Sequence, residues 1–169
     1  MITLQGVTVD NWQALVALRV APEQEAWVAP NHLSLLEAVY GLGGELAHLL
    51  LVPLAIYAGE QPVGLLLYNT SPMYDRFFVM RLMIDREQQG KGYGRAALTQ
   101  LLGLFRAYPQ AKEAAISYNL GNEPARRLYL SCGFAELGPD GAGGVLMWQA
   151  LHPQEQPWTS LWNPAIVAS

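Results

Sequence analysis

The segment that most restricts how this chain folds is an apolar run that leads through a glycine-rich loop into an amphipathic helix. Residues 77–84 are almost continuously apolar, as in a central strand covered on both faces. The glycine loop (residues 89–94, Gln-Gly-Lys-Gly-Tyr-Gly) follows, and residues 92–108 repeat apolar side chains at helical spacing before Pro109. A strand, a loop and a helix in succession predict an α/β structure built around a sheet.

The other elements follow from apolar periodicity and from turn and capping residues. Asp10 is expected to cap the first helix and Pro22 to stop it, while Asn122 is expected to cap the last helix. We expect further strands at 2–9, 54–58, 63–68, 114–118, 134–137 and 145–151, and further helices at 12–19, 33–40 and 123–131.

A chain of 169 residues has room for one ordinary domain. We expect that domain to span residues 1–151 and residues 152–169 to form a tail containing proline and tryptophan. The aromatic tail, with Trp158 and Trp162, motivates the hypothesis of a homodimer.

Composition excludes several classes of partner. The net charge is −4 and no run of lysine or arginine is present, so nucleic acid is not an expected partner. The single cysteine, Cys132, excludes an internal disulfide and belongs to no metal-binding motif, so no metal site is expected. The apolar stretch 46–58 is too short to cross a bilayer, and the absence of a signal-peptide pattern predicts a cytoplasmic protein without a membrane partner.

The glycine loop has the properties of an anion site. Several backbone N–H groups without bulky neighbours would stand beside the positive end of a helix dipole, as phosphate oxygens require. An ATP-type loop would need glycine at Asp85 and serine or threonine at Gly92, and a dinucleotide-binding loop would need glycine at Arg95. An ordinary strand-to-helix turn remains the structural alternative.

Two motifs in the same order resemble those of the GNAT superfamily of N-acetyltransferases. The first is Gln89-x-x-Gly92-x-Gly94. The second motif follows the fifth expected strand and has the sequence Asn122-x-x-Ala125-x-x-Leu128-Tyr129-x-x-x-Gly133-Phe134. The resemblance implies a single-domain α/β (α+β) fold with a mixed, mostly antiparallel sheet of six to seven strands and about four helices, in which the fourth and fifth strands splay apart.

The resemblance also implies acetyl-CoA as cosubstrate and an enzyme that acetylates an amine. The pantetheine arm would meet main-chain groups of the fourth strand, the pyrophosphate would lie on the glycine loop, and the second motif would add one amide side chain. These cofactor contacts fall on Leu82, Met83, Ile84, Gln89, Gly90, Lys91, Gly92, Tyr93, Gly94, Arg95 and Asn122. Helix capping is the structural role of Asn122, and both roles can hold together.

Tyr129 is the expected catalytic residue. In many relatives the tyrosine at this motif position is the general acid, because the departing thiolate needs a hydroxyl donor near the sulfur. The alternative is a core tyrosine beside Leu128 at helical spacing. The general base is unassigned, and its candidates are Glu25, Glu37, Asp75, Asp85, His32 and His48.

Residues 2–151 are most similar to bacterial spermidine/spermine N-acetyltransferases, and residues 81–94 carry most of that similarity. One departure is Ala29, where polyamine-acetylating relatives tend to have an acidic residue. A small-molecule amine, with polyamine as the first class, is therefore the expected acceptor, and Glu23, Glu25, Glu37 and Glu45 could supply negative charge. The alternatives are a protein N-terminus, an amino acid, an aminoglycoside, or a non-catalytic acyl-CoA sensor.

Overall fold

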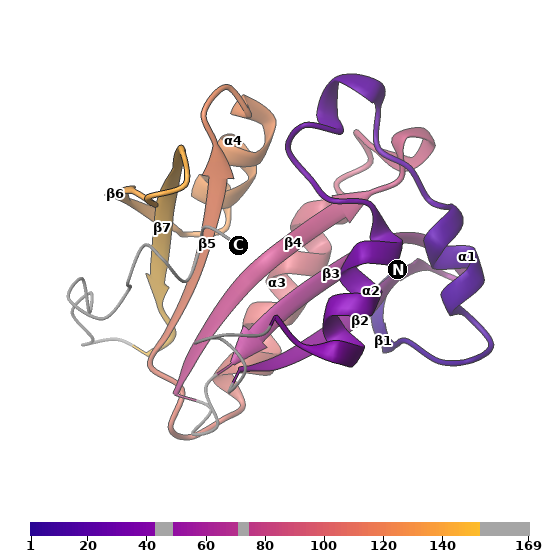
Figure 1. Ribbon diagram of the computed structural model, residues 1–169. Helices are drawn as coiled ribbons and strands as arrows, with labels where there is room; N and C mark the ends of the chain where they lie inside the picture. Colours follow the sequence, from indigo (N-terminus) through magenta and orange to yellow (C-terminus); the bar gives the residue numbers. More distant parts are fainter. Residues whose placement is uncertain (43–48, 71–74, 153–169) are drawn as a thin grey trace.

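The computed structural model describes residues 1–42, 49–70 and 75–152 (Figure 1). The elements are, in chain order, β1 (Ile2–Gly6), α1 (Trp12–Ala17), η1 (Pro22–Gln24), α2 (Asn31–Tyr40), β2 (Leu50–Ala58), β3 (Gln61–Thr70), β4 (Arg76–Ile84), η3 (Arg86–Gln88), α3 (Tyr93–Arg106), β5 (Glu113–Asn119), α4 (Glu123–Ser131), β6 (Ala135–Pro139) and β7 (Gly144–Ala150). The four α-helices and the mixed sheet of the described residues confirm the predicted fold class.

The seven strands form one sheet in the order β1-β2-β3-β4-β5-β7-β6. All neighbours are antiparallel except β4 and β5, which are parallel and pair only from Arg76↔Glu113 to Val79↔Ile116. Beyond that point the two strands diverge, and Figure 1 shows them as the two arms of a V. The predicted splay between the fourth and fifth strands is therefore confirmed.

Helices cover both faces of the sheet. In Figure 1, α1 and α2 lie in front of β2 to β4, whereas α3 and α4 lie behind the sheet. The larger core, on the α3 side, includes the stacked rings of Phe77 and Phe105, whose centroids are 4.0 Å apart. The smaller core, on the α1 and α2 side, includes Leu15, Leu65 and Met83. Burial on both faces explains why residues 77–84 read as a continuous apolar run.

A shift of register in β4 changes which side chains face the larger core. Tyr68 pairs with Val79 and Leu67 pairs with Arg81, so Met80 has no partner on β3. Such a one-residue bulge reverses the alternation of side chains along a strand. Val79 consequently belongs to the larger core and Leu82 packs against it, although the two are three positions apart and would face opposite sides of a regular strand.

The N-terminal segment differs from its prediction in four respects. β1 ends at Gly6 instead of residue 9, α1 ends at Ala17, and η1 contains Pro22 at its start. Asp10 does not cap α1, because Asn11 occupies the N-cap position and its Oδ1 accepts a hydrogen bond from Thr8 N at 2.8 Å.

The early end of α1 has a tertiary cause at Arg19. The Arg19 amide donates to Asp85 Oδ2 at 2.9 Å, and its carbonyl accepts from Arg86 N at 2.8 Å. These bonds hold residues 18–20 beside the end of β4, where they cannot continue a helix. The sequence contains no local signal for this long-range pairing.

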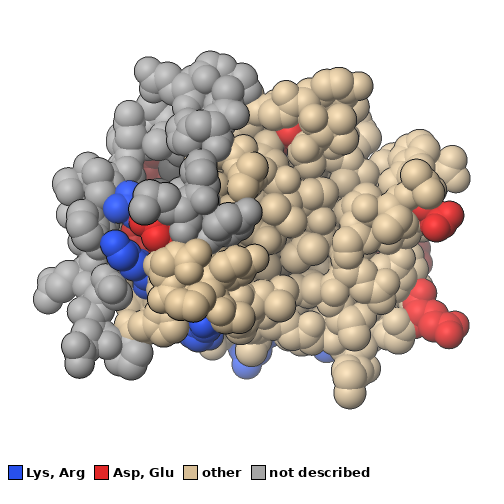
Figure 2. All heavy atoms as spheres, turned by 90° about the horizontal axis from the view of Figure 1, so that it is seen from below, with Lys and Arg blue, Asp and Glu red and all other residues tan. Residues whose placement is uncertain are grey.

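The surface agrees with the charge pattern of the sequence. On the face shown in Figure 2, Lys and Arg side chains lie at the left and along the lower edge, Asp and Glu side chains lie beside them at the left and also at the top and right, and no basic band crosses the described part of that face. Within the described ranges, no helix combines the length and the apolar character that a membrane span requires.

Candidate functional site

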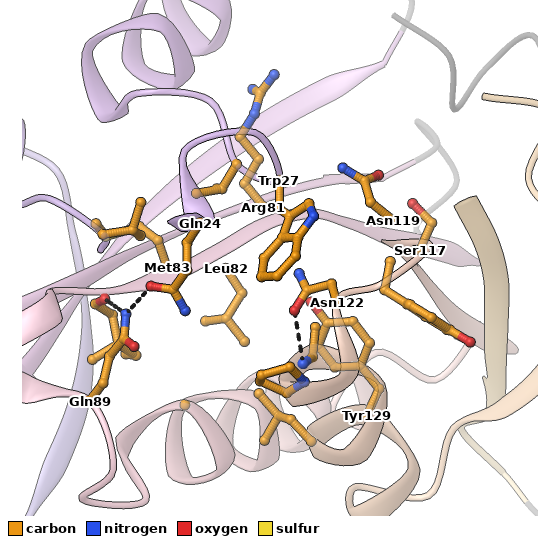
Figure 3. A pocket seen from close by; sticks show the side chains of 18 of the residues that line it. Gln24, Trp27, Arg81, Leu82, Met83, Gln89, Ser117, Asn119, Asn122 and Tyr129 are labelled. Carbon is orange, nitrogen blue, oxygen red and sulfur yellow. Dashed lines mark hydrogen bonds between the residues drawn. The ribbon is translucent and has the colours of Figure 1, made fainter. Parts of the chain in front are cut away.

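A cavity of about 1000 Å³ lies where β4 and β5 diverge (Figure 3). One half of this cavity is lined by the glycine loop and α4, and we call it the cofactor half after the role that the sequence predicts for these segments. The other half is lined by residues 24–29 together with Met80 and Arg81 of β4, and we call it the acceptor half because the predicted cofactor residues leave it to a second ligand. Residues 117–119 at the end of β5 form the opposite wall. The cavity is therefore built from segments that are distant in sequence and meet at the splay.

The glycine loop presents unpaired backbone donors to the cofactor half. Gly90 and Gly92 have φ angles of 77° and 78°, and Gly92 is the N-cap of α3. The first bond of the helix runs from Ala96 N to Gly92 O at 3.1 Å, so the amides of Tyr93, Gly94 and Arg95 precede it. These amides and the helix dipole make the loop suitable for phosphate oxygens.

The first glycine of the first motif, Gly92, is favoured by its backbone angle, whereas the second, Gly94, is favoured by the limited space around it. A Cβ at position 92 would meet no atom within 4 Å. A Cβ at position 94 would lie 3.3 Å from Leu128 Cδ2, because α3 and α4 approach closely there. Gly94 therefore brings α4, and with it the second motif, next to the loop.

Gln89 connects the glycine loop to both halves of the cavity. Its Nε2 donates to Ile84 O at 3.0 Å and to Gln24 Oε1 at 2.8 Å. Gln24 Oε1 also accepts from Ala21 N at 3.1 Å, which fixes η1 beside the loop. The amide nitrogen of Gln89 therefore bonds to other residues of the protein. Through Gln24, this residue of the first motif holds the segment that lines the acceptor half.

The edge of β4 that faces β5 has no strand partner beyond Val79 within the described residues. Leu82, Met83 and Ile84, which the sequence assigns to the cofactor, all line the cavity. The Ile84 carbonyl already accepts the bond from Gln89. The remaining free edge offers main-chain groups to an amide-containing ligand in the way that one strand pairs with another.

Lys91 is the one predicted cofactor residue that the structure places outside the cavity lining. Its side chain is exposed and turns back on the loop, where Nζ donates to Glu87 O at 3.2 Å and to Gln88 Oε1 at 2.8 Å. Gly90, Tyr93 and Arg95 line the cavity as the sequence predicts.

Asn122 and Tyr129 reach the cavity from α4. Asn122 is the N-cap of this helix, and its Oδ1 accepts from Ala125 N at 3.2 Å, which confirms the predicted capping role. Figure 3 shows both side chains below the Trp27 ring.

The Tyr129 side chain is largely buried, with an exposed fraction of 7%. Burial, with a smaller effect of the nearby Cys132, raises the pKa of Tyr129 well above its ordinary value. The hydroxyl is protonated at neutral pH, as in an ordinary tyrosine, and the raised pKa extends this protonation to higher pH. No described residue hydrogen-bonds to it, so it can donate to a ligand atom in the cavity.

Three of the four candidate carboxylate bases are not available to a ligand in the cavity. Two of them already bind other groups of the protein, and the third lies away from the cavity. Both oxygens of Asp85 accept from backbone amides, those of Arg19 at 2.9 Å and Glu87 at 3.0 Å. Glu37 forms a bidentate ion pair with Arg81. Asp75 directly precedes β4, at the end remote from the cavity.

Glu25 is the described candidate that lines the main cavity, and its side chain is exposed to water. His32 is exposed near the start of α2 and lines a smaller, adjoining cavity. His48 lies outside the described residues, as does Glu45.

Sequence reasoning assigned no role to several residues that line the cavity: Trp27, Arg81, Ser117, Asn119 and Asp140. A signal for Arg81 was present, because it is the one charged residue in the apolar run 77–84. Asp140 lies in a segment that reads only as a glycine-rich turn, and its place beside the cavity follows from the pairing of β6 with β7.

Comparison with known proteins identifies the family of this chain. Residues 12–134, which include both motifs, match the model of the acetyltransferase (GNAT) family. The spermine/spermidine N(1)-acetyltransferase of Bacillus subtilis is 29% identical over 139 residues, which cover 79% of this chain and 87% of that protein.

Solved structures show the same fold at low sequence identity. Spermidine N-acetyltransferase from Vibrio cholerae, in complex with CoA and spermine, superimposes with a TM-score of 0.68 at 15% identity, covering 89% of this chain and 95% of that one. An aminoglycoside acetyltransferase in complex with coenzyme A and kanamycin gives 0.70 at 20% identity with the same coverage.

The family model covers most of the chain and includes both segments that border the cofactor half of the cavity. This chain therefore belongs to the acetyltransferase (GNAT) family and is an N-acetyltransferase that uses acetyl-CoA as its cosubstrate.

Proposed function

We propose that the protein transfers an acetyl group from acetyl-CoA to a primary amine of a small molecule, by direct attack while both substrates occupy the cavity. The observation that carries this proposal is the continuity of the cavity, which extends from the glycine loop past Tyr129 to residues 24–29. A single space that holds both substrates makes a covalent acetyl-enzyme unnecessary. Effective concentration in such a complex lowers the barrier to reaction.

The residues of the cofactor half fit acetyl-CoA. The amides of Tyr93, Gly94 and Arg95 suit the pyrophosphate, the Arg95 side chain lines the same wall, and the free edge of β4 suits the amide groups of pantetheine. Bound there, acetyl-CoA supplies an activated thioester. We assign Gly90, Gly92, Gln89 and Asn122 to the support of this half, and Lys91 only through its backbone.

The acetyl-transfer reaction requires two proton transfers. A primary ammonium group has a pKa near about 10, so it must lose a proton before the nitrogen can attack. Glu25 can receive that proton through water, because it is exposed and lines the cavity. As the new C–N bond forms and the C–S bond breaks, the Tyr129 hydroxyl donates its proton to the sulfur and recovers one from solvent.

The acceptor is a primary amine in each class that the comparisons and the sequence suggest. The named relatives act on polyamines and aminoglycosides, and polyamines are therefore the first class to test. An amino acid and a protein N-terminus are the further candidates.

An assay of thiol release from acetyl-CoA, run with a panel of these amines, tests the proposal. The expected result is amine-dependent release of free CoA together with an acetylated amine seen by mass spectrometry. Thiol release without any acetylated product would indicate hydrolysis, and would overturn the proposed function.

A further inference from the structure

The acceptor half of the cavity carries little uncompensated negative charge. Arg81 enters it from β4 and pairs with Glu37 of α2, with side-chain exposed fractions of 15% and 19%. The two charges cancel at short range, because each is the other's nearest partner in a half-buried setting. In Figure 3 the guanidinium of Arg81 points away from Asn122 and Tyr129.

Two described carboxylates line the main cavity, and one of them is already compensated. Asp140 is 3% exposed, and its Oδ1 accepts from the amides of Ala142 and Gly144, each at 2.8 Å. Glu25 is the other. Ala29, which could have carried a third carboxylate, lines the same wall. The described residues thus offer one free carboxylate to an acceptor.

A smaller cavity of about 330 Å³ adjoins the acceptor half. Val20, Glu25, Val28, Ala29 and Met83 line both cavities, so they form a shared wall. The remaining lining residues follow α1 or stand at the start of α2, and they are Leu18, Arg19, Pro30, Asn31 and His32. Six of the ten lining residues of the smaller cavity are therefore apolar.

From this arrangement we propose that the preferred acceptor carries one ammonium group and an apolar body, and that the body lies against Trp27 and extends toward the smaller cavity. This inference rests on the proposed function and narrows its substrate class. A polyamine brings several positive charges, and each beyond the first would lose its hydration without gaining a carboxylate. An alkyl or arylalkyl amine loses water from apolar surface instead, which favours binding.

Trp27 suits such an acceptor because of its position in the cavity. Its ring points into the space between β4 and α4 in Figure 3 and is only partly buried. An indole face attracts both a single ammonium group and a flat apolar group.

The test compares butylamine, hexylamine and octylamine with spermidine and spermine in the assay of thiol release. We expect kcat/KM to rise roughly three- to fourfold for each added methylene while the cavity accommodates it, and to exceed the value for spermidine by tenfold or more at octylamine. A preference for spermidine, or no dependence on chain length, would overturn the inference and leave the proposed function intact. If neither these amines nor a wider panel of amines were acetylated, both this inference and the proposed function would be overturned.

Substitutions in residues 24–29 test where the apolar body of the acceptor lies. Ala29→Phe fills the shared wall and should abolish the gain with chain length, whereas Ala26→Phe adds the same volume at an exposed position that lines the main cavity alone and should preserve it. Ala29→Glu adds a carboxylate without filling the space to the same extent, and should raise kcat/KM for spermidine relative to octylamine. A chain-length gain that persists in Ala29→Phe would contradict the proposed location.

Discussion

Single residues in this site act through a backbone angle or through a protonation state. Gly92 adopts a φ of 78° at the N-cap of α3, a conformation that side chains with a Cβ rarely adopt. Burial of the Tyr129 side chain in the wall of the cavity raises the pKa of its hydroxyl, which therefore keeps its proton to a higher pH than an ordinary tyrosine does. Both properties can be tested by changing a single heavy atom of the side chain.

Replacing Tyr129 by phenylalanine removes the proposed proton donor and leaves the ring in place. We expect kcat to fall by roughly 10²- to 10⁴-fold, the usual range for general acid catalysis, with an almost unchanged Kd for acetyl-CoA. Steady-state kinetics and calorimetric titration measure the two quantities. Equal turnover in the variant would assign Tyr129 to the core alone.

Replacing Gly92 by alanine tests the backbone angle by itself, since the added Cβ would meet no atom within 4 Å. We expect a loss of about 1 to 2 kcal/mol in the free energy of unfolding and weaker binding of acetyl-CoA. The matched control is Gly103→Ala inside α3, which also meets no atom and should stabilise the helix by about 1 kcal/mol. Urea unfolding of both variants would contradict the argument if they shifted in the same direction.

Among the elements, β4 is the one whose irregularity creates the site. Its register shifts at Met80, directly after its last pair with β5 at Val79. The bulge and the end of the parallel pairing together open the V and turn Arg81 toward α2, where Glu37 pairs with it. Gly64 of β3 accommodates this strand, because a Cβ there would lie 2.3 Å from Met83 O.

The other arm of the V is held by contacts of Glu136 on β6. Its Oε1 accepts from Tyr118 Oη of β5 at 2.9 Å and from Arg126 Nε of α4 at 2.7 Å. These hydrogen bonds, first that from Tyr118 and then that from Arg126, lower the pKa of Glu136. A carboxylate with a lowered pKa stabilises the fold above its ordinary pKa, and this contribution disappears as the pH falls through the lowered value.

Glu136→Gln should therefore lower Tm at neutral pH, and the difference from the unchanged protein should shrink below about pH 4. The control is Glu123→Gln, which removes a looser contact with the same arginine at 3.8 Å and should change Tm less. Thermal unfolding followed by circular dichroism across this pH range measures both. A difference that is independent of pH would show that the carboxylate charge is not responsible.

In the whole molecule, the hydrogen bond between Gln24 and Gln89 joins the acceptor half to the cofactor half. Binding of acetyl-CoA at the glycine loop would therefore also favour the observed position of residues 24–29. A ligand that binds only the folded state stabilises it by mass action.

Acetyl-CoA at about 100 times its Kd should raise the free energy of unfolding by roughly 2.7 kcal/mol. Thermal or urea unfolding with and without acetyl-CoA measures this gain, and Gly92→Ala serves as the variant with a reduced gain at the same concentration. An absent shift in the unchanged protein at saturating acetyl-CoA would contradict the assignment of the glycine loop.

Two expectations for the whole molecule remain predictions. The division at residue 151 and the homodimer both depend on residues 153–169, including Trp158 and Trp162, which lie outside the described residues.

The sequence by itself determined the order of elements, the central position of residues 77–84, the glycine loop and the cap at Asn122, because each depends on neighbours within one turn or one strand. Only the tertiary structure decided where β4 shifts register, that Arg19 and Asp85 end α1 early, and that Trp27, Arg81 and Ala29 share the acceptor half. These features depend on pairings between residues far apart in the chain, which local patterns do not encode.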